Sequence, residues 1–171
     1  MSFKFSSLTS KELVFDSVAV YLQEKGIRVD KKDFTRPWGG FFVIDETDSE
    51  NFIKLYFPHL TIEDLKIAGK LSPKILVVAP EKRLSWQYHH RRAEIWKLIG
   101  GVAGVVISNT NEQKEQQQLN IGDIIQLKQG ERHRLIGLSG WGIVAEIWRH
   151  TDPSNPSDEE DIVRLQDDFG R

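Results

Sequence analysis

Side chains that can bind a metal gather in one short stretch of the sequence, from Gln87 to Glu94. If residues 84–89 form a strand, Gln87 and His89 are two apart and point to the same face. Glu94 can return to that face from the next strand, and His133 adds a second imidazole further along the chain. Such a set suits a divalent transition metal, with zinc first and manganese, iron, cobalt or nickel as alternatives. The spacing is equally compatible with surface histidines at a strand end.

The composition limits what kind of protein can carry such a site. The chain has 171 residues, a formal net charge of −2 and no cysteine. One domain of this length buries a substantial core, and this charge gives no indication of a nucleic-acid partner. The lack of cysteine excludes disulfides, thiolate metal sites and cysteine nucleophiles. No apolar run is typical of a signal or a membrane span, so the sequence predicts a cytoplasmic protein without a membrane partner.

The elements that must position these residues are one helix and many short strands. Thr9 to Glu12 has the capping-box pattern and Gly26 is a natural stop, which predicts an amphipathic helix over residues 10–25 that packs on the main domain or on a second subunit. A helical turn is predicted near residues 61–65, and polar loops at 45–51 and 109–118. Strands are predicted at residues 41–44, 52–57, 74–78, 84–89, 95–99, 104–107, 124–127, 134–138 and 143–148. Such close spacing indicates an antiparallel sandwich or barrel.

A second motif, bounded by glycines, leads to His133. Gly130 ends the strand predicted before it, and His133 follows three residues later. This spacing resembles the second motif of the cupins, with Lys128 in place of the usual proline. The stretch from Gln87 to Glu94 resembles the first cupin motif, with an amide in place of the usual first histidine.

The resemblance is closer to one family of cupins. Residues 84–96 read LSWQYHHRRAEIW and resemble the cupin domain of type II mannose-6-phosphate isomerases. The segments Arg36–Gly39, His133–Leu135 and Asp161–Arg171 resemble further motifs of that family, in the same order. Because the likeness begins at residue 36, residues 1–35 are expected to form a helical extension. Residues 36–171 are expected to form the cupin domain with its C-terminal tail segment. The implied fold class is all-β, a double-stranded β-helix or jelly-roll barrel preceded by an N-terminal α-helix.

The resemblance also implies a chemistry. The substrate would be a sugar phosphate and the reaction an aldose–ketose isomerisation of the mannose-6-phosphate type, in carbohydrate metabolism and polysaccharide biosynthesis. The implied metal ligands are Gln87, His89, Glu94 and His133. For the phosphate, guanidinium groups match its oxygens, so the candidates are Arg164 and Arg171, with Lys74 second; each could instead form a surface salt bridge. Trp38 or Trp141 could stack on a sugar ring.

Two departures from the family concern proton transfer. The family's third consecutive histidine is Arg91 here, and the histidine after the glutamate is Ile95. If either histidine moves the proton in relatives, this chain has lost it. The remaining candidates for a base are His90, Lys54 and Glu131, each of which is also explained as a surface residue.

Three functions therefore stay open. The first is the metal-dependent sugar-phosphate isomerase. The second is a metal-dependent cupin oxygenase, because two histidines and a carboxylate also form the facial triad of non-haem iron enzymes; an added Gln87 opposes it, since oxygen chemistry needs open positions. The third is a non-catalytic cupin that binds a sugar or serves in assembly. By analogy with cupins that pair through edge strands, a homodimer is expected.

Overall fold

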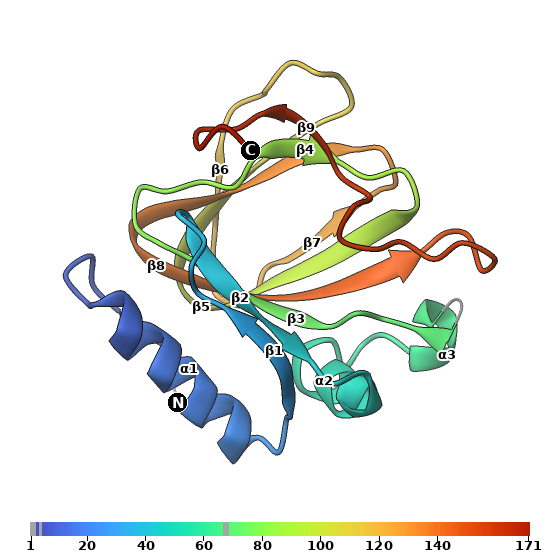
Figure 1. Ribbon diagram of the computed structural model, residues 1–171, viewed down its shortest axis with the longest axis horizontal. Coiled ribbons are helices and arrows are strands. Elements are labelled where there is room, and N and C mark those ends of the chain that lie inside the picture. The colour runs from blue at the N-terminus through green and yellow to red at the C-terminus, as the bar shows by residue number, and fades with distance from the viewer. Residues whose placement is uncertain (1–2, 4, 67–68) are drawn as a thin grey trace.

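The computed structural model describes residues 3, 5–66 and 69–171 of the chain (Figure 1). Its helical elements are α1 (Lys11–Glu24), the 3₁₀ turn η1 (Glu46–Asp48), α2 (Ser49–Tyr56) and α3 (Ile62–Leu65). Its strands are β1 (Val29–Asp33), β2 (Gly39–Ile44), β3 (Lys74–Val78), β4 (Trp86–Tyr88), β5 (Arg92–Ser108), β6 (Gln117–Leu119), β7 (Ile124–Leu127), β8 (Arg132–His150) and β9 (Val163–Gln166). The helices lie together on one side of a strand barrel, and β4 and β9 lie at its other end. The predicted all-β barrel preceded by an N-terminal helix is confirmed.

All strand pairings are antiparallel. The order β1-β2-β3-β8-β4-β9 forms one path, and β5 pairs with β8, β7 and β6. Each of β5 and β8 replaces two strands that the sequence predicts as separate. Gly101 explains why β5 continues: it sits at a register shift with φ of 70°, and a Cβ there would overlap the carbonyl oxygen of Trp141. The bulge bends the strand without ending it.

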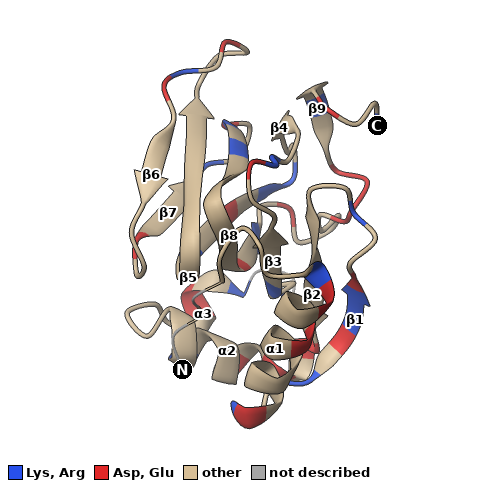
Figure 2. Cartoon of the chain, turned by 90° about the vertical axis from the view of Figure 1, so that its left-hand side faces the viewer, with Lys and Arg blue, Asp and Glu red and all other residues tan. Residues whose placement is uncertain are grey.

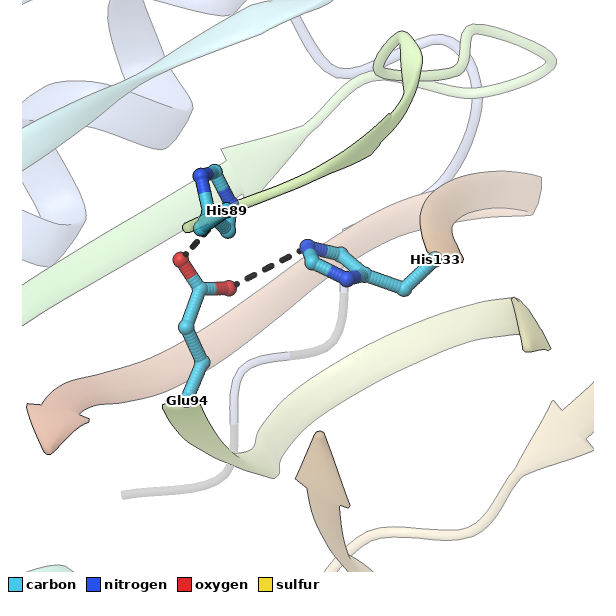
Figure 3. Close-up of side chains that lie close together, drawn as sticks. All are labelled: His89, Glu94 and His133. Atoms are coloured by element: carbon cyan, nitrogen blue, oxygen red, sulfur yellow. Dashed lines mark ion pairs between the residues drawn. The ribbon is translucent and has the colours of Figure 1, made fainter. Parts of the chain in front are cut away.

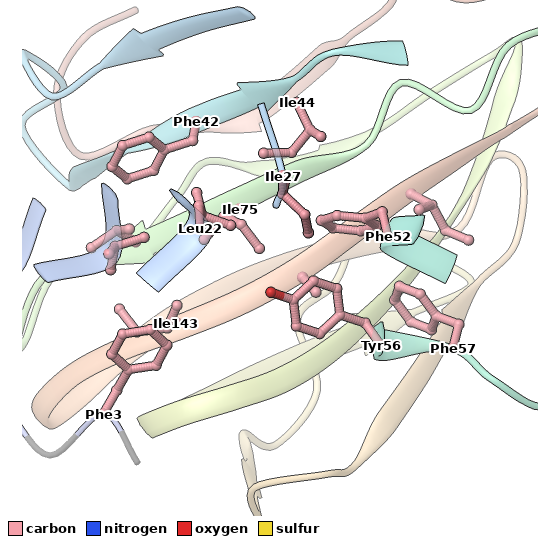
Figure 4. Close-up of a cluster of buried hydrophobic side chains, with 14 of the residues drawn as sticks. Phe3, Leu22, Ile27, Phe42, Ile44, Phe52, Tyr56, Phe57, Ile75 and Ile143 are labelled. Carbon is pink, nitrogen blue, oxygen red and sulfur yellow. The ribbon is translucent and has the colours of Figure 1, made fainter. Parts of the chain in front are cut away.

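Alternation along the strands separates two hydrophobic clusters. On β3, Ile75 and Val77 point outward to a cluster covered by α1 and α2, whereas Leu76 and Val78 point into the barrel. Figure 4 shows the outer cluster, in which Leu22 of α1 lies near Ile75. Burying each such side chain contributes about 1.5–3 kcal/mol. The inner cluster does not fill the whole barrel, and polar residues occupy one of its ends.

Helix α1 matches its predicted bounds within one residue at each end. Its N-cap is Ser10, whose Oγ accepts a hydrogen bond from the Leu13 amide at 3.3 Å, and not Thr9 as the capping-box pattern predicts. The helix packs on the sheet, where the Phe15 ring stacks on Phe42 with centroids 5.3 Å apart. Of the two expected partners, the main domain is therefore the one it covers. Strand β1 then pairs with β2 and continues the sheet ahead of residue 36.

The structure differs most from the prediction at residues 45–57. The sequence predicts a loop and a strand there, but the chain forms η1 and α2. Phe52, Ile53 and Tyr56 are buried together, at spacings that place them on one side of a helix. The aromatic and β-branched composition favoured a strand, and the helical spacing of the buried residues overrode it. Lys54 points to solvent, with its Nζ 2.6 Å from Glu50 Oε1.

Three strands were not predicted from the sequence, because they are short and polar. These are β1, β9, and β6, which lies partly in the loop predicted at residues 109–118. Strand β1 lies at the edge of the sheet and carries both acidic and basic residues, as Figure 2 shows. Charged residues of this kind discourage uncontrolled edge pairing. A homodimer stays a prediction. No helix among the described residues has both the length and the apolar character needed to cross a membrane.

Candidate metal centre

Three segments bring His89, Glu94 and His133 together at the polar end of the barrel (Figure 3). His89 directly follows β4, Glu94 lies on β5 and His133 on β8. The Nε2 atoms of the two histidines lie 3.1 and 3.3 Å from the two carboxylate oxygens of Glu94. All three side chains are buried, and one ligand atom from each lies within 4.8 Å of the others. This buried group could hold a metal ion.

The free atoms of the cluster fit a divalent metal. Among the described residues, Glu94 Oε2 and His133 Nε2 have no hydrogen-bond partner, and each such buried atom costs about 1–3 kcal/mol. His89 Nδ1 lies 2.6 Å from the carbonyl oxygen of Asp161, and His133 Nδ1 lies 2.9 Å from that of Glu131. Because a carbonyl oxygen only accepts, both Nδ1 atoms donate, and the Nε2 lone pairs face the glutamate.

The electrostatics favour the protonation states that bind a metal. Burial lowers the pKa of His89, which favours the neutral imidazole. Burial alone would raise the pKa of Glu94, but the positive charge of Arg92, whose Nε donates to Glu94 Oε1, helps to hold that pKa well below its usual value. A neutral imidazole and an ionised carboxylate are the forms that coordinate a cation.

Gln87 lies beside this cluster. It is the register partner of His133 across β4 and β8, and it lines the same cavity as Glu94. Its Oε1 accepts a hydrogen bond from Ser85 Oγ at 2.5 Å. Of the four implied ligands, three therefore form the cluster, and Gln87 as the fourth ligand stays a prediction.

Arg92 belongs to the site although no sequence motif pointed to it. Its Nε donates to Glu94 Oε1 at 2.8 Å. Its Nη1 donates to Ser157 Oγ and to the carbonyl oxygen of Asp158, both at 2.9 Å, and the guanidinium lies 3.6 Å from the centre of the Trp148 ring. Arg92 is thus a fixed cation next to the candidate metal ligands. The two-residue spacing to Glu94 on one strand is the signal that could have found it.

Glu94 of the cluster and the neighbouring Gln87 line a cavity of about 390 Å³. Its aromatic walls are Trp38, Phe41, Trp96 and Trp148. Its basic side chains include Arg36, Lys74, Arg92, Arg164 and Arg171, and its acidic side chains are Glu94, Glu146 and Glu159. An apolar wall with a few charged groups is the usual lining of a small-molecule site.

The structure places all three phosphate candidates on this cavity. Arg164 lies on β9, and burial together with the charges of Arg171 and Arg36 lowers its pKa, so three guanidinium groups are gathered there. Arg171 also forms an ion pair with Asp167, with Nη2 and Oδ1 2.7 Å apart. Lys74 is buried deeper, and its Nζ lies 3.9 Å from the centre of the Trp148 ring.

The structure places the three candidate bases away from the cavity. His90 is exposed, Lys54 lies on the outer helix α2, and Glu131 accepts a hydrogen bond from the Lys128 amide at 2.9 Å. None of the three lines the cavity in the part of the chain that the structure describes. The geometry brings another carboxylate, Glu146, into the cavity instead.

A buried His-Glu-His cluster inside an antiparallel barrel defines the chain as a cupin. Residues 46–167 match the sequence model of the family described as "Mannose-6-phosphate isomerase C-terminal". The match covers most of the chain, so the chain belongs to this family.

Two curated relatives match this chain over part of their own length. The alginate biosynthesis protein AlgA of Pseudomonas aeruginosa is 30% identical over 125 residues, which are 73% of this chain and 24% of that protein. The mannose-1-phosphate guanylyltransferase ManC of Salmonella typhimurium is 27% identical over 118 residues, 69% of this chain and 23% of that protein. This chain therefore spans about a quarter of the length of these relatives.

A solved structure supports the fold alone. The capsular polysaccharide assembling protein CapF from Staphylococcus aureus superposes with a TM-score of 0.52 at 13% sequence identity. The superposition covers 82% of this chain and 34% of that chain. At this identity the structural similarity supports the architecture but says nothing about activity.

Proposed function

We propose that the chain is a metal-dependent aldose–ketose isomerase of a sugar phosphate, of the mannose-6-phosphate isomerase type. One observation carries the proposal: Glu94 of the buried His-Glu-His cluster lines the same cavity as a group of arginines. His89, Glu94 and His133 would hold the metal, with Gln87 as the fourth ligand and zinc as the first choice. When bound, the metal polarises the oxygens on the two carbons that exchange oxidation state.

The protein's own residues would bind and orient the rest of the substrate. Arg164 and Arg171 bind the phosphate together with Arg36, because planar guanidinium groups match phosphate oxygens in pairs. The indole of Trp38 covers the sugar. Fixing both ends of the substrate holds the reacting carbons in place, which is how positioning lowers a barrier.

The two departures from the family lie away from the cavity. Arg91 forms an ion pair with Asp158, with Nη2 and Oδ2 3.1 Å apart, and Ile95 packs in the outer cluster. Neither side chain lines the cavity among the described residues. Histidines at these two positions would therefore contact the surface loop and the outer core. This observation favours an enzyme over the non-catalytic alternative.

The relatives support the substrate class. The names of the two curated relatives refer to alginate biosynthesis and to mannose 1-phosphate. A role in carbohydrate metabolism, in the synthesis of a polysaccharide, follows from the proposal.

The metal-loaded protein is expected to convert mannose 6-phosphate to fructose 6-phosphate, and removal of the metal is expected to abolish this conversion. The test is a coupled spectrophotometric assay on protein whose metal content is measured before and after chelation. Activity should return when zinc or manganese is added back. Full activity in metal-free protein would contradict the metal requirement. No turnover at full metal content would contradict the isomerase, and oxygen uptake or sugar binding would then separate the two other cupin functions.

Arg164→Ala is expected to raise KM for the sugar phosphate about tenfold, which corresponds to about 1.4 kcal/mol, with little change in kcat. The reason is that Arg164 contacts the phosphate in both the ground state and the transition state. Steady-state kinetics measure both constants. The control is Arg149→Ala, which changes an exposed arginine of β8 outside the cavity. Equal effects of the two substitutions would contradict the assignment.

A further inference from the structure

A third acidic residue lies deep in the cavity, on β8, the long strand that also carries His133. Glu146 of β8 is the register partner of Lys74 on β3 and of Trp96 on β5. It is 5% exposed and lines the same cavity as Glu94. A carboxylate at this depth is expensive to bury, and an apolar side chain would pack there at lower cost.

No structural role accounts for both oxygens of this carboxylate. Trp96 Nε1 donates a hydrogen bond to Glu146 Oε1 at 3.0 Å. Within residues 3, 5–66 and 69–171, no hydrogen bond or ion pair reaches Oε2. Its neighbour Lys74 is turned toward Glu159, with which it forms an ion pair. One oxygen of Glu146 is therefore fixed by an indole, and the other is free to meet a ligand in the cavity.

Burial and the neighbouring charges bring the pKa of Glu146 close to neutral pH. Burial raises the pKa of Glu146 to about 7, and the charges of Glu94 and Glu159 act in the same direction. Lys74 and Arg92 oppose them. A group with a pKa near the working pH is present in both forms and suits general acid–base catalysis.

The other carboxylates of the cavity are already occupied. Glu94 faces the two histidines and Arg92, and Glu159 is paired with Lys74 on the exposed side. The remaining carboxylate that lines the cavity is Glu146. It lines the same cavity as Glu94 of the cluster that would hold the metal, as a base acting beside a polarised carbonyl must.

We propose that Glu146 is the catalytic residue that moves the proton between the two reacting carbons, an assignment that rests on the proposed isomerase function. Its free oxygen takes the proton from C2 of the open-chain aldose phosphate. The C2–H electron pair becomes the C1=C2 double bond, and the C1 carbonyl pair moves onto O1 to give an enediolate. Glu146 returns the proton to C1, the carbonyl forms at C2, and the hydroxyl proton of O2 passes to O1. Atoms and electrons balance without any co-reactant.

The test compares Glu146→Gln with Glu115→Gln, the same change at an exposed glutamate outside the cavity. The amide oxygen can still accept the bond from Trp96, so the fold should persist. We expect kcat of Glu146→Gln to fall about 10²–10⁴-fold while KM and metal content stay unchanged. Proton exchange into the substrate from D₂O, followed by NMR, should fall with it. Glu115→Gln should keep kcat within about threefold, because Glu115 does not line the cavity.

Two further readouts separate catalysis from structure. In wild-type protein kcat should rise with pH through about 7, because the base must be ionised, and the residual activity of Glu146→Gln should lack this rise. In metal-free protein, the glutamate carboxyl ¹³C signal that Glu146→Gln removes should titrate near pH 7. A titration in the ordinary range of an exposed glutamate would overturn the proposal.

The outcomes distinguish this proposal from the one on which it rests. If wild-type protein isomerises and Glu146→Gln does so within about threefold, Glu146 is not the base and the isomerase stands. If metal-loaded wild-type protein neither isomerises nor exchanges protons, both proposals fall. Should Glu146→Gln fail to fold, Glu146→Asp retracts the carboxylate by one methylene. Undiminished kcat and exchange in that variant would overturn the assignment.

Discussion

Glu94→Gln is expected to remove metal binding and isomerase activity together. Glu94 is 2% exposed, and its oxygens face His89 Nε2 and His133 Nε2 at 3.1 and 3.3 Å. Glutamine keeps the shape but loses the negative charge, and its NH₂ group would point at one imidazole lone pair. A cation at this position would lose the anionic ligand of the cluster. Activity should fall to background, because the step that needs a polarised carbonyl would lack its metal.

The same substitution should also lower stability. Arg92 Nε donates to Glu94 Oε1 at 2.8 Å, and removing the carboxylate leaves a buried guanidinium without its counter-charge. Breaking a buried pair in this way costs about 3–5 kcal/mol. Metal analysis, thermal unfolding and the coupled assay measure the three effects on one preparation. Glu115→Gln, in an exposed loop, is the control. A variant that retains one metal per chain would contradict the assignment of Glu94 as a ligand.

Arg92→Gln is expected to destabilise the metal-free protein strongly and the metal-loaded protein much less. In the metal-free protein Arg92 is the cation bonded to Glu94, and its loss leaves a buried carboxylate, at a cost of about 3–5 kcal/mol. A bound metal supplies a second positive charge and should restore much of this loss. The rise in Tm on adding zinc to chelated protein should therefore be larger in the variant than in the wild type.

Thermal unfolding of chelated and zinc-loaded samples checks this prediction. The control is Arg149→Gln, which alters an exposed arginine on the outer face of β8. An unchanged Tm of the metal-free variant would show that the pair between Arg92 and Glu94 contributes nothing to stability. Equal zinc-induced shifts in variant and wild type would show that the metal does not act on Glu94.

Arg92 also connects the tail segment to the site. Its Nη1 bonds reach Ser157 and Asp158, and the carbonyl oxygen of Asp161 accepts from His89 Nδ1. The segment after β8 therefore orients a candidate ligand and a buried cation at once. Mutating groups that orient ligands in this way typically weakens metal binding about 10–100-fold.

The sequence by itself determined the elements whose evidence is local. Helical spacing with a stop glycine placed α1 within one residue at each end, and the strand predicted at residues 84–89 contains β4. The four family-like motifs led to the cupin fold, and three of the four implied ligands form one cluster. Local signals failed at residues 52–57, because composition and spacing disagreed there and the packing of Phe52 and Tyr56 on the sheet decided the outcome.

Only the tertiary structure decided which other charged residues belong to the site. Glu146 is one acidic residue in a long apolar strand, and its position against Lys74 and Trp96 depends on the register of strands far apart in the chain. The same pairing turned Ile95 into the outer core and left His90 exposed, although both adjoin ligands in sequence. Burial and neighbouring charges set the pKa of a carboxylate, and both arise only when distant strands meet.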